Sequence, residues 1–372
     1  MVQNFDISDR TRTELKSRSG GGEKTADGSV SVGSSDSEAS SDLEYSEKEQ
    51  VNRLDNLQIE FSLIYDFAIF ACTYYLHLSL GKKFYVMRYY QVDTATYGRG
   101  LEDGYLMITM IVNLMLVRSF MIRFVFSQLA NLLGIHKYKA VQRFKEQGWS
   151  LTYYSCSWCF GFYLYWKSDY FLNMRNVFAG WPDQNLSYGF KFFYLIETSC
   201  YIQQMIVLHI EEKRKDYLEM FFHHIITSIL CLESYRTCFT RVGHVILLLM
   251  DIGDVFLSLA KVLKYCGFGR ICDVVFILFM IIWIVLRHGV YNYVVYYIYS
   301  SALGVMENDC SKFSPGSNEI CCTQGKLNSF VVLLTGLQII TCLWLYMIFR
   351  VAIKVIRGAP AEDVRSDDEQ VI

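Results

Sequence analysis

Long apolar runs are the feature that most constrains the fold of this chain. Eight runs are each long enough to cross the core of a bilayer, which takes ~20 helical residues. They cover residues 58–80, 104–126, 149–171, 188–210, 217–236, 241–264, 271–299 and 328–350. None alternates as a membrane β-strand does, and the helix is the remaining structure that satisfies its own backbone in lipid. The sequence therefore predicts an all-α membrane protein, a polytopic helical bundle.

The two ends of the chain are polar. Residues 1–55, rich in Ser, Gly and acidic residues, should form a disordered cytosolic tail, and residues 357–372 a second acidic tail. Residues 56–144 should hold N-terminal transmembrane helices and a basic cytosolic loop. Four serines have Glu three residues on, which suits an acid-directed kinase; the alternative is a tail that only binds water. These candidate phosphorylation sites are Ser35, Ser41, Ser46 and Ser366.

Basic residues mark the loops expected on the cytosolic side. They cluster within 136–145, 213–215, 261–270 and 350–357, which suits an even number of spans with both termini in the cytosol. The first fifty residues lack the basic start and apolar run of a signal peptide, so the first span should be an uncleaved anchor. One loop departs from the pattern, because its basic residues would face the lumen. They are Lys82, Lys83, Arg88 and Arg99.

Two lumenal loops carry candidate covalent modifications. Asn185-Leu-Ser187 is an acceptor triplet for N-glycosylation, although it lies close to a predicted span. Cys310, Cys321 and Cys322 share one polar loop, where an oxidising lumen would favour a disulfide.

Imidazole and carboxylate groups occur inside two neighbouring predicted helices. A charged group deep in a membrane helix costs ~2.5–3.5 kcal/mol, so its presence suggests function. His223 follows the basic loop by eight residues, or ~12 Å of helix, and Asp254 precedes Lys261 by seven, or ~10 Å. Because the two helices run antiparallel, His223 and His224 should meet Asp251 and Asp254 at one level of the cytosolic half.

This set of residues favours acid–base or nucleophilic chemistry. Imidazole is the usual general base near neutral pH, and a carboxylate can orient it. Basic residues of the adjoining loops suit the phosphates of coenzyme A. These are Lys213, Arg214, Lys215, Lys261 and Lys264. Two alternatives are a purely structural His–Asp cluster and a metal site; with seven histidines and one adjacent pair, no metal is expected.

The segment 215–265 resembles the signature of ceramide synthases in the TLC-domain superfamily. The matching positions are His223, His224, Thr227, Ser234, Tyr235, Arg241, Gly243, Asp251, Asp254, Ala260 and Lys261. Weaker similarity extends over most of residues 145–356, which would be the TLC acyltransferase domain. Many animal members have His where this chain has Met250, and Glu where it has Ser258, so the resemblance is to fungal members. It implies a six-helix TLC-type barrel preceded by about two further transmembrane helices.

The resemblance also implies an activity. A fatty acyl group would pass from acyl-CoA, a co-substrate rather than a cofactor, to the amine of a sphingoid base, giving dihydro- or phytoceramide. It implies an endoplasmic-reticulum location, a small single-pass regulatory subunit and a homo- or heterodimer, with membrane lipids around the chain and no nucleic acid as partner. The alternative is a non-enzymatic TLC-domain protein, such as a cargo receptor or translocon-associated factor.

Arg287, seventeen residues past Arg270, should lie toward the lumen, away from the His pair.

Overall fold

The computed structural model describes residues 33–74, 79–182, 185–211, 215–306 and 321–357. The chain divides into two compact units, residues 1–49 and 50–372. The first part of helix α2 belongs to the former, and the helical bundle with its cavities belongs to the latter. The helices are α2 Gly33–Tyr74, α3 Ser79–Tyr85, α4 Asp103–Phe120, η1 Met121–Phe126, α5 Ser127–Leu132, α6 Tyr138–Trp166, α7 Met174–Phe178, α8 Tyr188–Ile210, α9 Tyr217–Arg236, α10 Thr240–Tyr265, α11 Gly269–Ile282, η2 Trp283–Val290, α12 Tyr291–Ser300, α13 Ala302–Val305 and α14 Gln324–Ile356.

The prediction of an all-α polytopic membrane protein is confirmed. Among the described residues, strands are confined to one short hairpin, β1 Tyr90–Gln91 and β2 Thr96–Tyr97. Three helical stretches are long and apolar enough by composition to cross a membrane: Asp103–Leu132, Gly269–Ser300 and Gln324–Ile353. The other predicted spans also fall largely on helices, and three of these, α8, α9 and α10, carry many of the buried polar side chains of the bundle.

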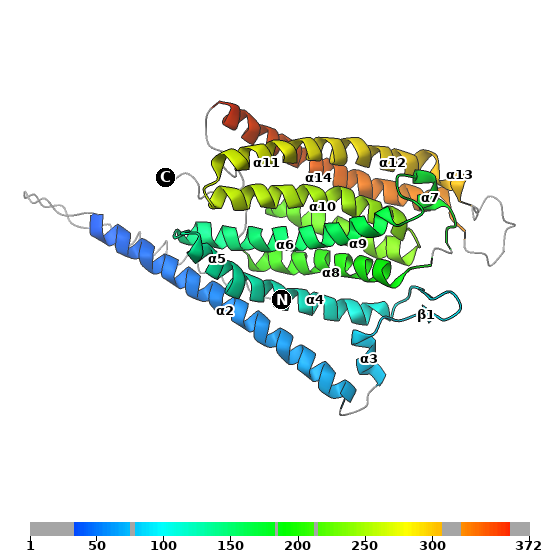
Figure 1. Ribbon diagram of the computed structural model, residues 1–372, viewed down its shortest axis with the longest axis horizontal. Helices are drawn as coiled ribbons and strands as arrows, with labels where there is room; N and C mark the ends of the chain where they lie inside the picture. Colours follow the sequence, from blue (N-terminus) through cyan, green and yellow to red (C-terminus); the bar gives the residue numbers. More distant parts are fainter. Residues whose placement is uncertain (1–32, 75–78, 183–184, 212–214, 307–320, 358–372) are drawn as a thin grey trace, which may run out of the picture. The chain divides into compact units, whose positions relative to one another are not determined.

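The main bundle consists of α6, α8, α9, α10, the α11–η2–α12 stretch and α14 (Figure 1). Helix α10 packs along both α6 and α11, while α8 packs along α9 and along α4, which precedes the bundle. The apolar core includes Tyr194 of α8, Leu247 of α10, Tyr291 of α12 and Leu334 of α14, each nearly or fully buried. These contacts hold four helices around a common interior, which also contains the candidate site.

A tight turn brings α11 back along α10. Gly267 has φ +80°, a conformation that costs glycine nothing and strains other residues. Its N–H donates to the Lys264 carbonyl at 3.0 Å, and the next N–H, of Phe268, donates to the Leu263 carbonyl at 3.0 Å. This capping pattern satisfies the last carbonyls of α10 and ends the helix. The α11–η2 stretch therefore runs antiparallel to α10.

The loop between α3 and α4 is attached to the end of the bundle opposite this turn. Its hairpin pairs Tyr90 with Tyr97, and Tyr97 in turn bridges to Leu186 just before α8. Arg99 donates from Nη2 to Thr240 Oγ1, at the start of α10, over 3.1 Å. The loop with the unexpected basic residues thus lies at the end away from the 261–270 loop, as the alternating topology predicts.

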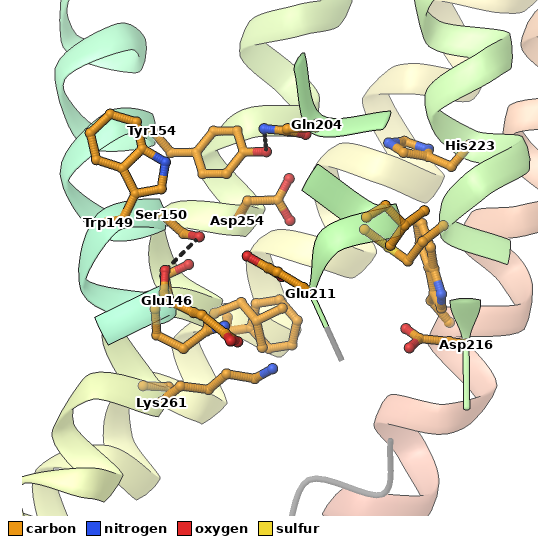
Figure 2. A pocket seen from close by; sticks show the side chains of 18 of the residues that line it. Glu146, Trp149, Ser150, Tyr154, Gln204, Glu211, Asp216, His223, Asp254 and Lys261 are labelled. Atoms are coloured by element: carbon orange, nitrogen blue, oxygen red, sulfur yellow. Dashed lines mark hydrogen bonds between the residues drawn. The ribbon is translucent and has the colours of Figure 1, made fainter. Parts of the chain in front are cut away.

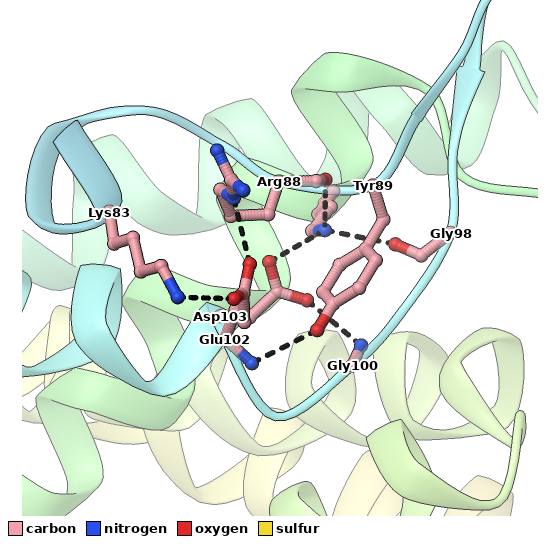
Figure 3. A network of polar contacts seen from close by, with 8 residues as sticks. Lys83, Arg88, Tyr89, Gly98, Gly100, Glu102 and Asp103 are labelled. Atoms are coloured by element: carbon pink, nitrogen blue, oxygen red, sulfur yellow. Dashed lines mark hydrogen bonds and ion pairs between the residues drawn. The ribbon is translucent and has the colours of Figure 1, made fainter. Parts of the chain in front are cut away.

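Acidic partners explain why that loop tolerates its positive charges. Glu102 accepts from Lys83 at 2.5 Å and from Arg88 at 2.9 Å (Figure 3). Next to it, Asp103 forms a buried ion pair with Lys191 of α8, with Oδ1 and Nζ 2.8 Å apart. Because these cations are neutralised locally, they weigh less in the balance of charge that orients a membrane protein.

Candidate active site

A cavity of about 300 Å³ lies between α6, α8, α9, α10, η2 and α14 and reaches Lys261 and Lys264 at the basic end of the bundle. A second cavity, of about 50 Å³, lies deeper, among mainly apolar side chains such as Leu230, Leu247 and Leu334. His223 and Tyr201 line both cavities. The two chambers therefore meet at an imidazole, with charged and apolar side chains on one side of it and mainly apolar side chains on the other.

The two imidazoles occupy adjacent positions of α9. Their ring centroids are 5.3 Å apart, and His224 is only 4% exposed. The ring of His223 packs on Trp344 of α14, with centroids 5.1 Å apart. Both Nδ1 atoms are buried, and neither makes a hydrogen bond within the described part of the chain. Buried polar atoms are normally paired, so an unpaired imidazole nitrogen at a cavity suggests a role in chemistry.

The carboxylates lie near the imidazoles but are held by other side chains. Asp254 lines the larger cavity on the side toward which His223 points (Figure 2). Asp251 is 1% exposed and accepts a hydrogen bond from the Tyr201 hydroxyl at 2.8 Å. The Tyr201 ring lies 6.2 Å from that of His224, centroid to centroid. Tyr201 thus separates Asp251 from the imidazole, and among the described residues neither carboxylate hydrogen-bonds to the His pair.

The position of Arg287 corrects the sequence-based prediction. It lines the larger cavity with His223, and its Nη2 donates to Asp254 at 2.9 Å. One reason is that α10 continues beyond Lys261 to Tyr265, so Asp254 lies about one helical turn, ~5.4 Å, deeper than the spacing from Lys261 suggests. The other is that a helical side chain points back toward the start of its own helix, which for α11–η2 is the basic end.

Charges of both signs surround the mouth of the cavity. Lys261 and Lys264 line it, and so does Arg118 of α4, which forms an ion pair with Glu211. Of the other predicted cations, Lys215 is exposed and does not line the cavity, while Lys213 and Arg214 lie outside the described residues. Acidic residues line the same region: Glu146, Glu211 and Asp216 (Figure 2). The mouth is therefore mixed in charge rather than uniformly basic.

Comparison with known proteins places this arrangement in a family. The model of the TLC domain matches residues 143–350. A sphingosine N-acyltransferase-like protein of Alternaria alternata is 36% identical over 80% of this chain and 76% of its own length. A sphingosine N-acyltransferase of Schizosaccharomyces pombe is 35% identical over 81% and 76%, and a ceramide synthase of Gibberella moniliformis 33% over 77% and 72%. The chain belongs to the ceramide synthase family of TLC-domain proteins.

Within this TLC domain, the sequence reasoning missed several residues of the site. Tyr201 and Glu197 of α8 lie next to Asp251, and Tyr153 of α6 donates in turn to Glu197. Glu197 gave the same signal as the aspartates, an acidic residue in the middle of an apolar run. Arg118 could not be found in this way, because its place at the cavity depends on how α4 packs against α8.

Two of the candidate modification sites, Asn185 and Cys321, do not line the cavity. Asn185 is exposed, and the Ser187 hydroxyl of its triplet accepts from the Phe190 N–H at the start of α8. The predicted disulfide is confirmed for Cys321, whereas Cys322 is a buried thiol that donates to the Thr323 carbonyl at 3.7 Å. Of the remaining candidates, Cys310 and Ser366 lie outside the described residues, and for the predicted serines of α2 only the helical backbone is described: Ser35, Ser41 and Ser46.

Proposed function

We propose that the chain transfers a fatty acyl group from acyl-CoA to the amine of a sphingoid long-chain base, dihydrosphingosine or phytosphingosine. The product is a dihydro- or phytoceramide. The observation that carries the proposal is the place of His223, which lines at once a chamber that carries charged groups and a chamber of mainly apolar side chains. An acyl thioester has the same division, a polar coenzyme on one side of the reacting carbonyl and an apolar chain on the other.

The chemistry requires a group that exchanges protons near neutral pH. In one form of the mechanism the His223 imidazole attacks the thioester carbonyl, the C–S bond breaks and the amine then displaces the imidazole. In the other form the imidazole takes a proton from the amine as it attacks. Either route converts an ammonium and a thioester into an amide and a thiol, and releases one proton. His224, whose ring lies 5.3 Å from that of His223, orients it or relays the proton.

The other residues hold charge and orientation. Arg287 fixes Asp254 at the cavity wall, so that a carboxylate is available to the positive charge of the amine or the imidazolium. Lys261 and Lys264 at the mouth suit the coenzyme's phosphates, and the acidic residue Glu211 suits the ammonium of the base. The apolar chamber beyond His223 would take the first part of the acyl chain. This mechanism needs no metal and no cofactor besides the acyl-CoA co-substrate.

The setting of the enzyme is part of the same proposal. Residues 145–356 would form the acyltransferase domain in the endoplasmic-reticulum membrane, after the N-terminal helices of 56–144, with both terminal tails in the cytosol. The lipid bilayer would deliver both oily substrates, and a single-pass regulatory subunit and a second synthase chain are the protein partners we propose. Phosphorylation of the tails and glycosylation of Asn185 remain proposals of the same kind.

The test is acyl transfer by the purified protein in detergent, with a sphingoid base and labelled acyl-CoA. We expect ceramide to form, and we expect His223→Ala and His224→Ala each to lower the rate by about 10²–10⁴-fold, the usual contribution of a general acid–base group. His136→Ala is the matched control, because this histidine is exposed in a loop and lines neither cavity. A folded His223→Ala protein with the normal rate would refute the proposed role, and a wild-type protein that forms no ceramide would favour the non-enzymatic alternative.

A further inference from the structure

A second carboxyl group lies against Asp251, deep in the bundle. Glu197 of α8 is 0% exposed, and its Oε1 accepts from the Tyr153 hydroxyl at 3.0 Å and from the Ser157 hydroxyl. Asp251 is held in the same manner, since its Oδ1 accepts from the Tyr201 hydroxyl at 2.8 Å. Each carboxyl group thus has one oxygen fully engaged by hydroxyl donors.

The remaining oxygen of each carboxyl group is without a donor. Glu197 Oε2 and Asp251 Oδ2 are buried, and neither has a hydrogen-bond partner within the described residues. The two carboxyl groups nevertheless lie within hydrogen-bonding reach of each other. An ionised carboxylate has acceptors only, so a hydrogen bond between two carboxyl groups requires a proton on one of them. From this geometry we infer that Glu197 and Asp251 share a single proton and carry one negative charge between them.

One cation among the described residues acts on the pair, and a second carboxylate shares it. The titratable groups that face the pair are Tyr153 and Tyr154 of α6, Cys200 and Tyr201 of α8, Cys231 of α9, Asp254 of α10 and Arg287 of η2. Of these, within the described parts of the chain, Arg287 is the cation, and it is already bound to Asp254. Two full negative charges in contact in an apolar interior would repel strongly. The shared proton removes that repulsion.

This pair lies one side chain behind the cavity, so Glu197 is a positioning residue that acts through Asp251 and Tyr201. Tyr201 donates to Asp251 and also lines both chambers, next to His224. This part of the inference rests on the proposed function: through Asp251 and Tyr201, Glu197 sets the charge near the imidazoles during acyl transfer. As the pH rises and the shared proton leaves, a second negative charge develops beside Tyr201 and changes the strength of its hydrogen bond.

A direct test is infrared spectroscopy of the full-length protein in detergent. A protonated carboxylic acid buried in the bundle gives a carbonyl band that moves when water is replaced by D₂O. We expect one such band in the wild type and its loss in both Glu197→Gln and Asp251→Asn, because each variant leaves a lone carboxylate with its hydroxyl donors intact. Glu102→Gln is the matched control and should retain the band, since that carboxylate is paired with Lys83 and Arg88. Absence of the band from the wild type, or its persistence in both single variants, overturns the inference.

The second test concerns activity. Glu197→Gln keeps the shape of the pair and a donor toward Asp251 but cannot ionise. We expect the alkaline limb of its pH–rate profile to be displaced from that of the wild type by about one pH unit or more, the scale on which a neighbouring charge acts. Superimposable profiles would show that Glu197 is purely structural. If the protein made no ceramide, the proposed function would be refuted, but the infrared measurement would still test whether Glu197 and Asp251 share a proton. The failure of one hypothesis can therefore be distinguished from the failure of the other.

Discussion

The buried ion pair between Asp103 and Lys191 offers a test of what holds the N-terminal helices to the bundle. The Lys191 side chain is 0% exposed, lies 2.8 Å from Asp103 Oδ1, and also donates to the carbonyls of Arg88 and Gly98 at 3.0 and 2.9 Å. Asp103 Oδ2 accepts from the Tyr235 hydroxyl at 2.7 Å. This one carboxylate therefore joins α4, α8 and α9. The perturbation is Asp103→Asn, which keeps the shape and removes the charge.

The expected loss follows from the geometry. Two unit charges 2.8 Å apart attract by ~6 kcal/mol at an effective dielectric constant of about 20. Two carbonyl acceptors remain with the ammonium group, so part of this is retained. Removal of one partner of a buried pair typically costs ~3–5 kcal/mol, because an uncompensated charge stays behind. We expect Asp103→Asn to lower the free energy of unfolding by that amount, a large share of the ~5–15 kcal/mol that stabilises a folded domain.

The assay is chemical unfolding of the detergent-solubilised protein, followed by tryptophan fluorescence. Glu102→Gln is the matched control, because the adjacent carboxylate forms ion pairs whose side chains are 27–38% exposed and should matter far less. The double variant Asp103→Asn with Lys191→Met should recover stability relative to Asp103→Asn alone, since it no longer buries a lone charge. Equal losses in Asp103→Asn and Glu102→Gln would refute the reasoning.

Two further predictions concern stability. The pKa of Glu102 is lowered below its ordinary value of 4.5, mainly by the hydrogen bond from Lys83. The stability that the ionised Glu102 contributes is therefore present above that value and is lost as the pH falls through the lowered pKa. The unfolding curves of the wild type and of Glu102→Gln should converge in acid. In Gly243→Ala, the new methyl group would lie 2.1 Å from the Tyr194 hydroxyl, and we expect a loss of ~1–3 kcal/mol, measured by thermal unfolding; Gly304→Ala, with no atom within 4 Å, should be neutral.

The sequence predicted the parts of the structure that depend on one helix at a time. Apolar runs placed the helices, and the cost of burying charge marked His223 and Asp254 as residues that need a reason to be there. The prediction failed for Arg287, where the outcome depends on how far a neighbouring helix extends and on the direction in which a long side chain points. Arg118 was missed for a similar reason, since a helix outside the family signature supplies it. The placement of side chains from different helices relative to one another depends on how the helices pack, and the sequence of a single apolar run does not specify that packing.

Two polar clusters inside this bundle show how function can be separated from structure. In the cluster around Asp103 and Lys191, the ammonium group is paired with one carboxylate and two carbonyls, as a buried charge is in a stable protein core. In the cluster around His223 and His224, the Nδ1 atoms have no hydrogen-bond partner within the described residues, although they are buried and line a cavity. Leaving a buried polar atom unpaired costs ~1–3 kcal/mol. A protein tolerates this destabilisation where a substrate supplies the missing hydrogen-bond partner. The acyl group should therefore react at His223 and His224, and not at the more highly charged cluster around Asp103 and Lys191.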